Sequence, residues 1–180
     1  MYDIVIKQIT EFDIPDKVKW YNDDEITEFL HYEEKFTIEK SLEWIKKIEN
    51  DTSRYENVLK VKKDSQLINI GIIGLFNIDL KNKKAGFYIT IGSKEYQGKG
   101  LAKKTTIIFL KHCFKKFNLE KIYLYTDSDN ITAQKLYEKV GFTKEGLLRR
   151  ELFYKNRFID RYYYGILRHE FFSLYLNEGD

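Results

Sequence analysis

The chain contains few of the residues that define small secreted, metal-binding or membrane proteins. Its 180 residues include one cysteine, Cys113, and one proline. A single cysteine excludes an internal disulfide framework and a multi-cysteine zinc site. No stretch approaches the roughly 20 apolar residues that span a bilayer, and the first residues lack the basic head and apolar core of a signal peptide. We therefore expect a cytoplasmic protein with no membrane partner.

Charge of one sign is also scarce. The 31 basic and 28 acidic side chains leave a net charge of +3. Proteins that bind nucleic acid usually concentrate basic residues in a stripe or tail, whereas the lysine pairs of this chain are scattered along its length. The histidines His31, His112 and His169 show no ligand spacing. We expect neither a nucleic-acid partner nor a bound metal.

The remaining composition is typical of one folded domain. Apolar residues make up 43% of the chain and charged residues 33%, which suits a packed core beneath a polar surface. No linker rich in proline, glycine or serine and no internal repeat divides the sequence. We expect one domain over residues 1–167, followed by a C-terminal tail over residues 168–180.

Hydrophobic periodicity predicts a mixed order of strands and helices. Strand patterns occupy residues 2–9, 57–63, 68–76, 85–91, 121–126, 142–148 and 152–167, the last with a turn at 155–156. Helical patterns follow Asp13 or Asp16, then Thr37, the segment 97–102 and Asn130. The order β-α-α-β-β-β-α-β-α-β-β indicates an α/β domain with helices on both faces of a sheet.

The segment 97–102 (Gln-Gly-Lys-Gly-Leu-Ala) lies between a predicted strand and a long predicted helix. Two glycines at the start of a helix let backbone N–H groups converge on an anion, and the helix N-terminus adds partial positive charge. Lys99, Lys103 and Lys104 can add full charges nearby. The spacing is neither that of a Walker loop nor that of the dinucleotide fingerprint. From this segment alone, a phosphate site and a plain strand-to-helix turn both stay open.

A second motif follows the next predicted strand, where residues 130–142 read Asn-Ile-Thr-Ala-Gln-Lys-Leu-Tyr-Glu-Lys-Val-Gly-Phe. At this point the chain resembles the GNAT family of N-acetyltransferases. The family's pyrophosphate loop, Q/R-x-x-G-x-G/A, is matched by Gln97, Gly100 and Ala102. Its later segment, N-x-x-A-x-x-x-Y-x-x-x-G-F, is matched by Asn130, Ala133, Tyr137, Gly141 and Phe142. The two motifs lie in the right order, with a helix and a strand of suitable length between them.

The resemblance implies a GNAT fold, which is a mixed, mostly antiparallel sheet flanked by helices. In that fold the strand over residues 85–91 would splay from the strand over residues 121–126. The resemblance also implies acetyl-CoA as co-substrate, with no metal. The expected cofactor-binding residues are Gln97, Gly98, Lys99, Gly100, Leu101 and Ala102 at the pyrophosphate, the backbone of Ile89 and Ile91 at the pantetheine, and Asn130 at the cofactor arm.

Tyr137 is the catalytic residue that the resemblance implies. It would lie near the sulfur and protonate the leaving thiolate, since a phenol's pKa of about 10 lies above a thiol's of about 8.5. Without the family resemblance, Tyr137 is an aromatic residue on an apolar helix face, and the alternative interpretation is that it only packs in the core. Related sequences often carry a glutamate, able to relay the amine proton, where this chain has Gly86. The general base is therefore left open.

The C-terminal pattern is similar to the subgroup that contains spermidine and ribosomal-protein N-terminal acetyltransferases. It comprises Glu-Gly at 145–146, Arg149 and Asn-Arg-Phe-Ile-Asp at 156–160. The resemblance implies direct attack by a primary amine in a ternary complex, with a small amine or polyamine as the acceptor. Glu33 and Glu34 would attract a cationic acceptor by charge, although an exposed acidic pair before a helix is an equally good interpretation.

Other functions stay open at this point. The acceptor could be a nucleotide-linked amino sugar or a protein N-terminus, and the chain could be a CoA-binding module without turnover. An intact Tyr137 argues against the module, whereas Gly86 favours it. A homo-oligomer is also compatible with the sequence.

Overall fold

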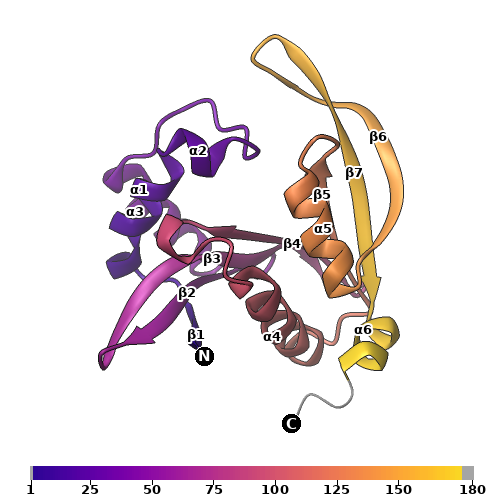
Figure 1. The fold of residues 1–180 in the computed structure, drawn as a ribbon, viewed down its shortest axis with the longest axis horizontal. Helices are drawn as coiled ribbons and strands as arrows, with labels where there is room; N and C mark the ends of the chain where they lie inside the picture. The colour runs from indigo at the N-terminus through magenta and orange to yellow at the C-terminus, as the bar shows by residue number, and fades with distance from the viewer. Residues whose placement is uncertain (1, 176–180) are drawn as a thin grey trace.

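The computed structural model describes residues 2–175, which form one seven-stranded sheet with helices around it (Figure 1). The strand order is β1-β2-β3-β4-β5-β7-β6. The strands are β1 (Asp3–Gln8), β2 (Tyr55–Lys63), β3 (Gln66–Asp79), β4 (Lys84–Ile91), β5 (Lys121–Asp127), β6 (Thr143–Tyr154) and β7 (Arg157–Leu167). The helices are η1 (Glu11–Asp13), α1 (Ile14–Tyr21), α2 (Asp24–Thr27), α3 (Ile38–Ile48), η2 (Lys94–Tyr96), α4 (Leu101–Lys116), α5 (Ile131–Val140) and α6 (Arg168–Tyr175).

Neighbouring strands pair antiparallel except β4 and β5, which run parallel. The β4–β5 pairing covers only residues 84–86 of β4 and 121–123 of β5. Past Gly86, β4 keeps its partner β3 as far as Ile91, while β5 keeps β7 as far as Asp127. The two central strands therefore splay apart, as expected, and the mixed, mostly antiparallel α/β fold is confirmed.

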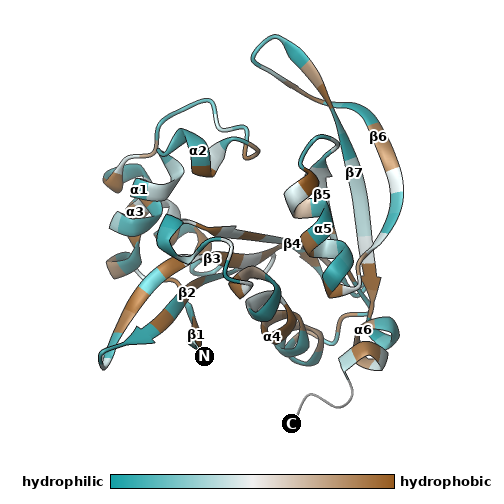
Figure 2. Ribbon diagram, in the orientation of Figure 1, coloured by the Kyte–Doolittle hydropathy of each residue, from teal (hydrophilic) through white to brown (hydrophobic). Residues whose placement is uncertain are grey.

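Buried side chains form two clusters, one on each face of the sheet. The larger cluster joins α4, α5 and α6 to the strands, with Leu110, Val140 and Phe171 among its members. The smaller joins α1 to β2 and β3 through residues such as Trp20 and Val58, with α3 packed against it. We call these two sides the α4 face and the α1 face. Figure 2 shows hydrophobic residues concentrated on the central strands and on α4.

Side chains alternate between these two faces along each strand. On β4, Phe87 belongs to the α4-face cluster, whereas its neighbour Tyr88 packs against the α1-face cluster. The Phe76 ring of β3 contacts both Tyr88 and Tyr123 of β5, with centroids 6.5 and 6.0 Å apart. Tyr123 therefore lies on the α1 face, and alternation places Asp127, at the end of β5, on the same face.

The structure departs from the sequence prediction in the C-terminal third. The predicted break between residues 148 and 152 is wrong, because β6 continues through it as a bulge at which Arg150 takes a φ of 54°. Residues 168–175 of the segment set apart as a tail form α6, which buries Phe171 completely. Residues 176–180 lie outside the described part. Within residues 2–175, no helix is long and apolar enough to cross a membrane.

Candidate functional site

Two glycines keep the start of α4 open to an anion. Gly98 and Gly100 have φ values of 69° and 73°, which glycine adopts without strain. A Cβ built on either residue would meet no atom within 4 Å, so both border open space. Gly100 is the N-cap of α4 and offers no side-chain hydrogen bond to the first N–H groups. Those N–H groups and the helix's partial positive charge suit a phosphate or pyrophosphate.

Contacts on both sides hold this loop at the end of β4. The Gln97 Nε2 donates a hydrogen bond to the Ile91 carbonyl oxygen at 2.9 Å. The Leu101 side chain is buried in the α4-face cluster, and the Lys99 ammonium lies 5.5 Å from the centroid of the Tyr96 ring. The loop therefore presents mainly its backbone to the open space.

The predicted cofactor residues outside the loop lie beside the splayed strands. Ile89 and Ile91 belong to the stretch of β4 that has β3 on one side and has left β5 on the other. Their side chains pack against the α4-face cluster. At the edge that β5 has left, the Ile91 carbonyl oxygen accepts the hydrogen bond from Gln97. Asn130 Oδ1 accepts a hydrogen bond from the Ala133 N–H at 3.0 Å and so caps α5.

Tyr137 projects from α5 into the α4-face cluster and is only 7% exposed. Its ring centroid lies 6.4 Å from that of Phe87, the first residue of β4 past the β4–β5 pairing. Burial raises the pKa of Tyr137 to about 12, and the nearby Arg161 charge offsets part of that rise. The phenol therefore keeps its proton at neutral pH and stands next to the point where the strands separate.

The predicted substrate residues Glu33 and Glu34 lie on the exposed loop between α2 and α3. Glu34 forms an ion pair with Lys40 at 2.8 Å, and this contact holds the pKa of the Glu34 carboxyl below its usual range. Glu33 forms no ion pair with another described residue. The two acids are therefore unequal, with Glu33 alone carrying an uncompensated charge.

The missing glutamate at Gly86 has a steric explanation. A Cβ on Gly86 would overlap the end of the Phe76 ring, which itself packs against Tyr88 and Tyr123. A longer side chain at this position would have to displace that ring. Position 86, on the α1 face of β4, therefore carries no acid.

Sequence patterns gave no indication of a buried charged cluster at the end of β5. His31 Nε2 lies 2.5 Å from Asp127 Oδ2, and the two side chains are 9% and 1% exposed. Arg161 Nε of β7 lies 3.4 Å from Asp127 Oδ1. The two members of the first pair are 96 residues apart in sequence, so no local spacing could have connected them.

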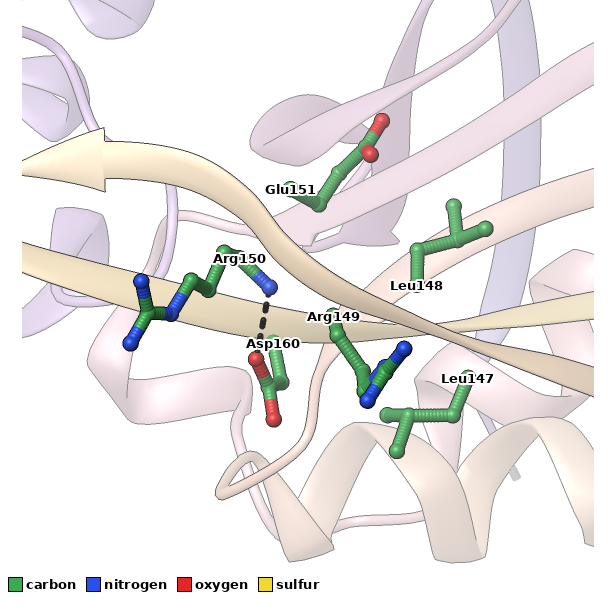
Figure 3. A pocket seen from close by; sticks show the side chains of 6 residues that line it. All are labelled: Leu147, Leu148, Arg149, Arg150, Glu151 and Asp160. Atoms are coloured by element: carbon green, nitrogen blue, oxygen red, sulfur yellow. Dashed lines mark hydrogen bonds between the residues drawn. The ribbon is translucent and has the colours of Figure 1, made fainter.

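A cavity of about 570 Å³ lies along β6 and β7 (Figure 3). Its lining consists of Leu147, Leu148, Arg149, Arg150, Glu151 and Asp160. The Arg150 N–H donates to Asp160 Oδ1 at 2.7 Å across it. None of the predicted site residues lines this cavity, so we place the candidate site at the splay of β4 and β5. Within residues 2–175, no three His, Cys, Asp or Glu side chains are grouped to hold a metal.

The two predicted motifs thus lie at the two ends of the stretch of β4 that has separated from β5: the loop contacts Ile91, and the Tyr137 ring lies beside Phe87. The profile of the family described as an acetyltransferase (GNAT) domain matches residues 3–143. The chain belongs to the GNAT acetyltransferase family. Its expected enzyme class, a GNAT-family N-acetyltransferase, is thereby confirmed.

Similar proteins place the chain near the spermidine acetyltransferases of this family. The spermidine N(1)-acetyltransferase of Vibrio cholerae is 38% identical over 120 residues, which cover 67% of this chain and 66% of that enzyme. The structure of a Vibrio cholerae spermidine N-acetyltransferase in complex with CoA and spermine has a TM-score of 0.85 at 28% identity, covering 93% of this chain and 97% of that one. A dodecameric structure of the Vibrio cholerae spermidine N-acetyltransferase has a TM-score of 0.78 at 29% identity, covering 98% of each chain.

The contact between Gly86 and Phe76 predicts the cost of restoring a side chain on this GNAT strand. Gly86→Ala should lower the free energy of unfolding by about 1–3 kcal/mol, the usual cost of overpacking a core. The matched control is Gly146→Ala on β6, where a Cβ would meet no atom within 4 Å, and its effect should stay within about 0.5 kcal/mol. Urea unfolding of both variants measures the difference. Equal stability of the two would show that Phe76 does not close this position.

Proposed function

We propose that this chain transfers the acetyl group of acetyl-CoA to a primary amine of a polyamine or another small amine. The observation that supports this most strongly is the splay of β4 from β5 with the glycine loop at one end and Tyr137 beside it. Direct attack in a ternary complex fits the site, because no described nucleophile stands there to carry an acyl group. Cys113, the single cysteine, is fully buried in the core, where burial raises the pKa of its thiol.

The residues present fit acetyl-CoA, which would supply an activated thioester carbonyl. The N–H groups of residues 98–102 would hold the pyrophosphate, since a Cβ on Gly98 or Gly100 would enter the space that it needs. The backbone of Ile89 and Ile91 would pair with the pantetheine amides at the open edge of β4. Asn130 would contact the cofactor arm while it continues to cap α5.

Tyr137 would act as the general acid. Its pKa of about 12 keeps the hydroxyl protonated over the whole working range of pH. The hydroxyl can therefore donate to sulfur once negative charge develops there as the carbon–sulfur bond breaks. No other described residue accepts a hydrogen bond from this hydroxyl, so it is available to the ligand.

A polyamine is the acceptor class that the comparisons support. The Vibrio cholerae neighbour was solved with CoA and spermine, and a polycation would be drawn to the uncompensated charge of Glu33. Glu34 would add less, because Lys40 neutralises it. The dodecameric neighbour supports a homo-oligomer for this chain too, and a cytoplasmic location stays a prediction.

Release of free CoA thiol with a panel of acceptors tests the proposed function. Spermidine and spermine should be acetylated faster than a nucleotide-linked amino sugar or a peptide N-terminus. Glu33→Gln should raise the KM for spermidine several-fold, as expected for a charge contact worth about 0.2–1 kcal/mol, while Glu34→Gln serves as the matched control with a smaller effect. If the protein bound acetyl-CoA but acetylated none of these amines, it would be a binding module rather than an enzyme of this kind.

The role of Tyr137 has its own test. Tyr137→Phe keeps the ring and removes the hydroxyl, so kcat should fall by about 100-fold or more, with acetyl-CoA affinity unchanged. Tyr164→Phe is the matched control, because Tyr164 packs beside Tyr137 but gives its hydroxyl to Glu138 at 2.9 Å. Stopped-flow turnover and calorimetry measure the two quantities. A Tyr137→Phe enzyme with full kcat would make Tyr137 a core residue only.

A further inference from the structure

The general base that Gly86 cannot supply has a candidate on the α1 face. We infer that His31 Nδ1 accepts the proton of the acceptor ammonium, with Asp127 as the positioning residue that orients the imidazole. This role rests on the proposed acetyl transfer and assigns a residue to its first proton transfer, the loss of a proton from the acceptor ammonium.

The contact between His31 and Asp127 has the geometry of a base and its orienting carboxylate. Asp127 Oδ2 lies 2.5 Å from His31 Nε2, which assigns the ring proton to Nε2 because a carboxylate accepts. The lone pair then lies on Nδ1. That atom is buried and has no hydrogen-bond partner in the described chain. A buried polar atom without a partner is rare in folded proteins, and an acceptor ammonium would supply the missing contact.

Side chains from three strands surround the His31 imidazole. The titratable groups that face His31 are Asp127 of β5, Arg161 of β7, which reaches it through Asp127, and Tyr154 of β6. Asp127 contacts the imidazole directly, whereas Arg161 lies on the other carboxylate oxygen, at 3.4 Å. The buried Asp127 carboxylate therefore has a counter-charge of its own in Arg161, independent of the imidazole.

His31 and Tyr137 flank β5 from opposite faces of the sheet. Asp127 lies on the α1 face, while Tyr137 belongs to the α4-face cluster. Gln134, three residues before Tyr137 on α5, donates from Nε2 to the Asp127 carbonyl oxygen at 3.2 Å. An amine arriving on the α1 face would thus meet a proton acceptor there. The sulfur leaving on the α4 face would meet a proton donor.

An aromatic contact covers the imidazole. The Tyr154 ring lies edge-on to the His31 ring, with centroids 5.0 Å apart. The Tyr154 hydroxyl donates one exposed hydrogen bond to the Tyr32 carbonyl oxygen at 3.0 Å. This cover connects the tip of the β6–β7 hairpin to the loop after α2.

The protons balance in this scheme. The acceptor ammonium loses one proton to His31 Nδ1, and its nitrogen keeps the electron pair that forms the new N–C bond. The C–S bond breaks, its electron pair leaves on sulfur, and Tyr137 donates a proton to that sulfur. The amide nitrogen releases a second proton to solvent, from which Tyr137 is reprotonated, and His31 returns its own proton to solvent. The net products are the acetamide, free CoA thiol and one proton.

The pH dependence of kcat for spermidine shows whether His31 acts as a general base or only stabilises the loop after α2. At pH 7, His31→Gln should reduce kcat by about 100-fold. The ratio of wild-type kcat to His31→Gln kcat should fall by about tenfold for each unit of rising pH. The reason is that the neutral fraction of a primary amine rises in that proportion below the amine's pKa of about 10. Asp127→Asn should give the same converging profile. His112→Gln, on α4 beside Tyr55, is the matched control and should keep the wild-type profile.

Each outcome of this experiment bears on the inference. A His31→Gln profile parallel to wild type would overturn it, because loss of a mere loop contact lowers kcat equally at every pH. If the unmodified protein acetylates spermidine while the His31→Gln profile runs parallel to its own, the proposed acetyl transfer still stands. A wild-type protein that acetylates no amine at any pH would overturn both.

Nitrogen NMR reports which ring nitrogen of His31 carries the proton, without a substitution at His31 or Asp127. The chain has only three histidines, so His112→Gln and His169→Gln identify the His31 signals by elimination. We expect the neutral ring to carry its proton on Nε2, and the Nδ1 resonance to shift when spermidine is added with CoA. A proton on Nδ1 of the neutral ring, or no response to spermidine, would contradict the assignment.

Discussion

The early end of β4–β5 pairing is the constraint on which the site depends. Each strand keeps one partner, β3 or β7, and turns its other edge toward the opening. A buried backbone group left without a partner costs about 1–3 kcal/mol, so such an edge is tolerated where water or a ligand with its own amides can take the place of a strand. In the proposed function, this edge pairs with an extended, amide-containing molecule, and the glycine loop at its end holds a phosphate.

The splay also divides the chemistry between two faces. Helices α4 and α5 bring the anion loop and Tyr137 to one side, while the loop after α2 brings His31 to the other. In the proposed reaction, the cofactor loop and Tyr137 act from the α4 face, and His31 acts from the α1 face.

Much of the fold and half of the site could be predicted from sequence, for identifiable reasons. The glycine loop and the Asn130 cap are local features whose spacing reports backbone geometry directly, and the structure shows both. The bulge at Arg150 could not be predicted, since a bulge depends on the partner strand. The inequality of Glu33 and Glu34 arises from Lys40, and the His31–Asp127 contact arises from the way the loop after α2 folds over the sheet. Contacts of this kind carry no local pattern.

Amide hydrogen exchange with and without acetyl-CoA tests most directly whether the splayed strands hold the cofactor. Exchange should slow at residues 87–91 of β4 and at residues 97–104, which include the loop and the first turn of α4. Gly100→Asn should keep the fold, because asparagine tolerates left-handed φ values, and it should lose this protection because its side chain enters the open space. Binding of acetyl-CoA with protection elsewhere, and none along β4, would contradict the account.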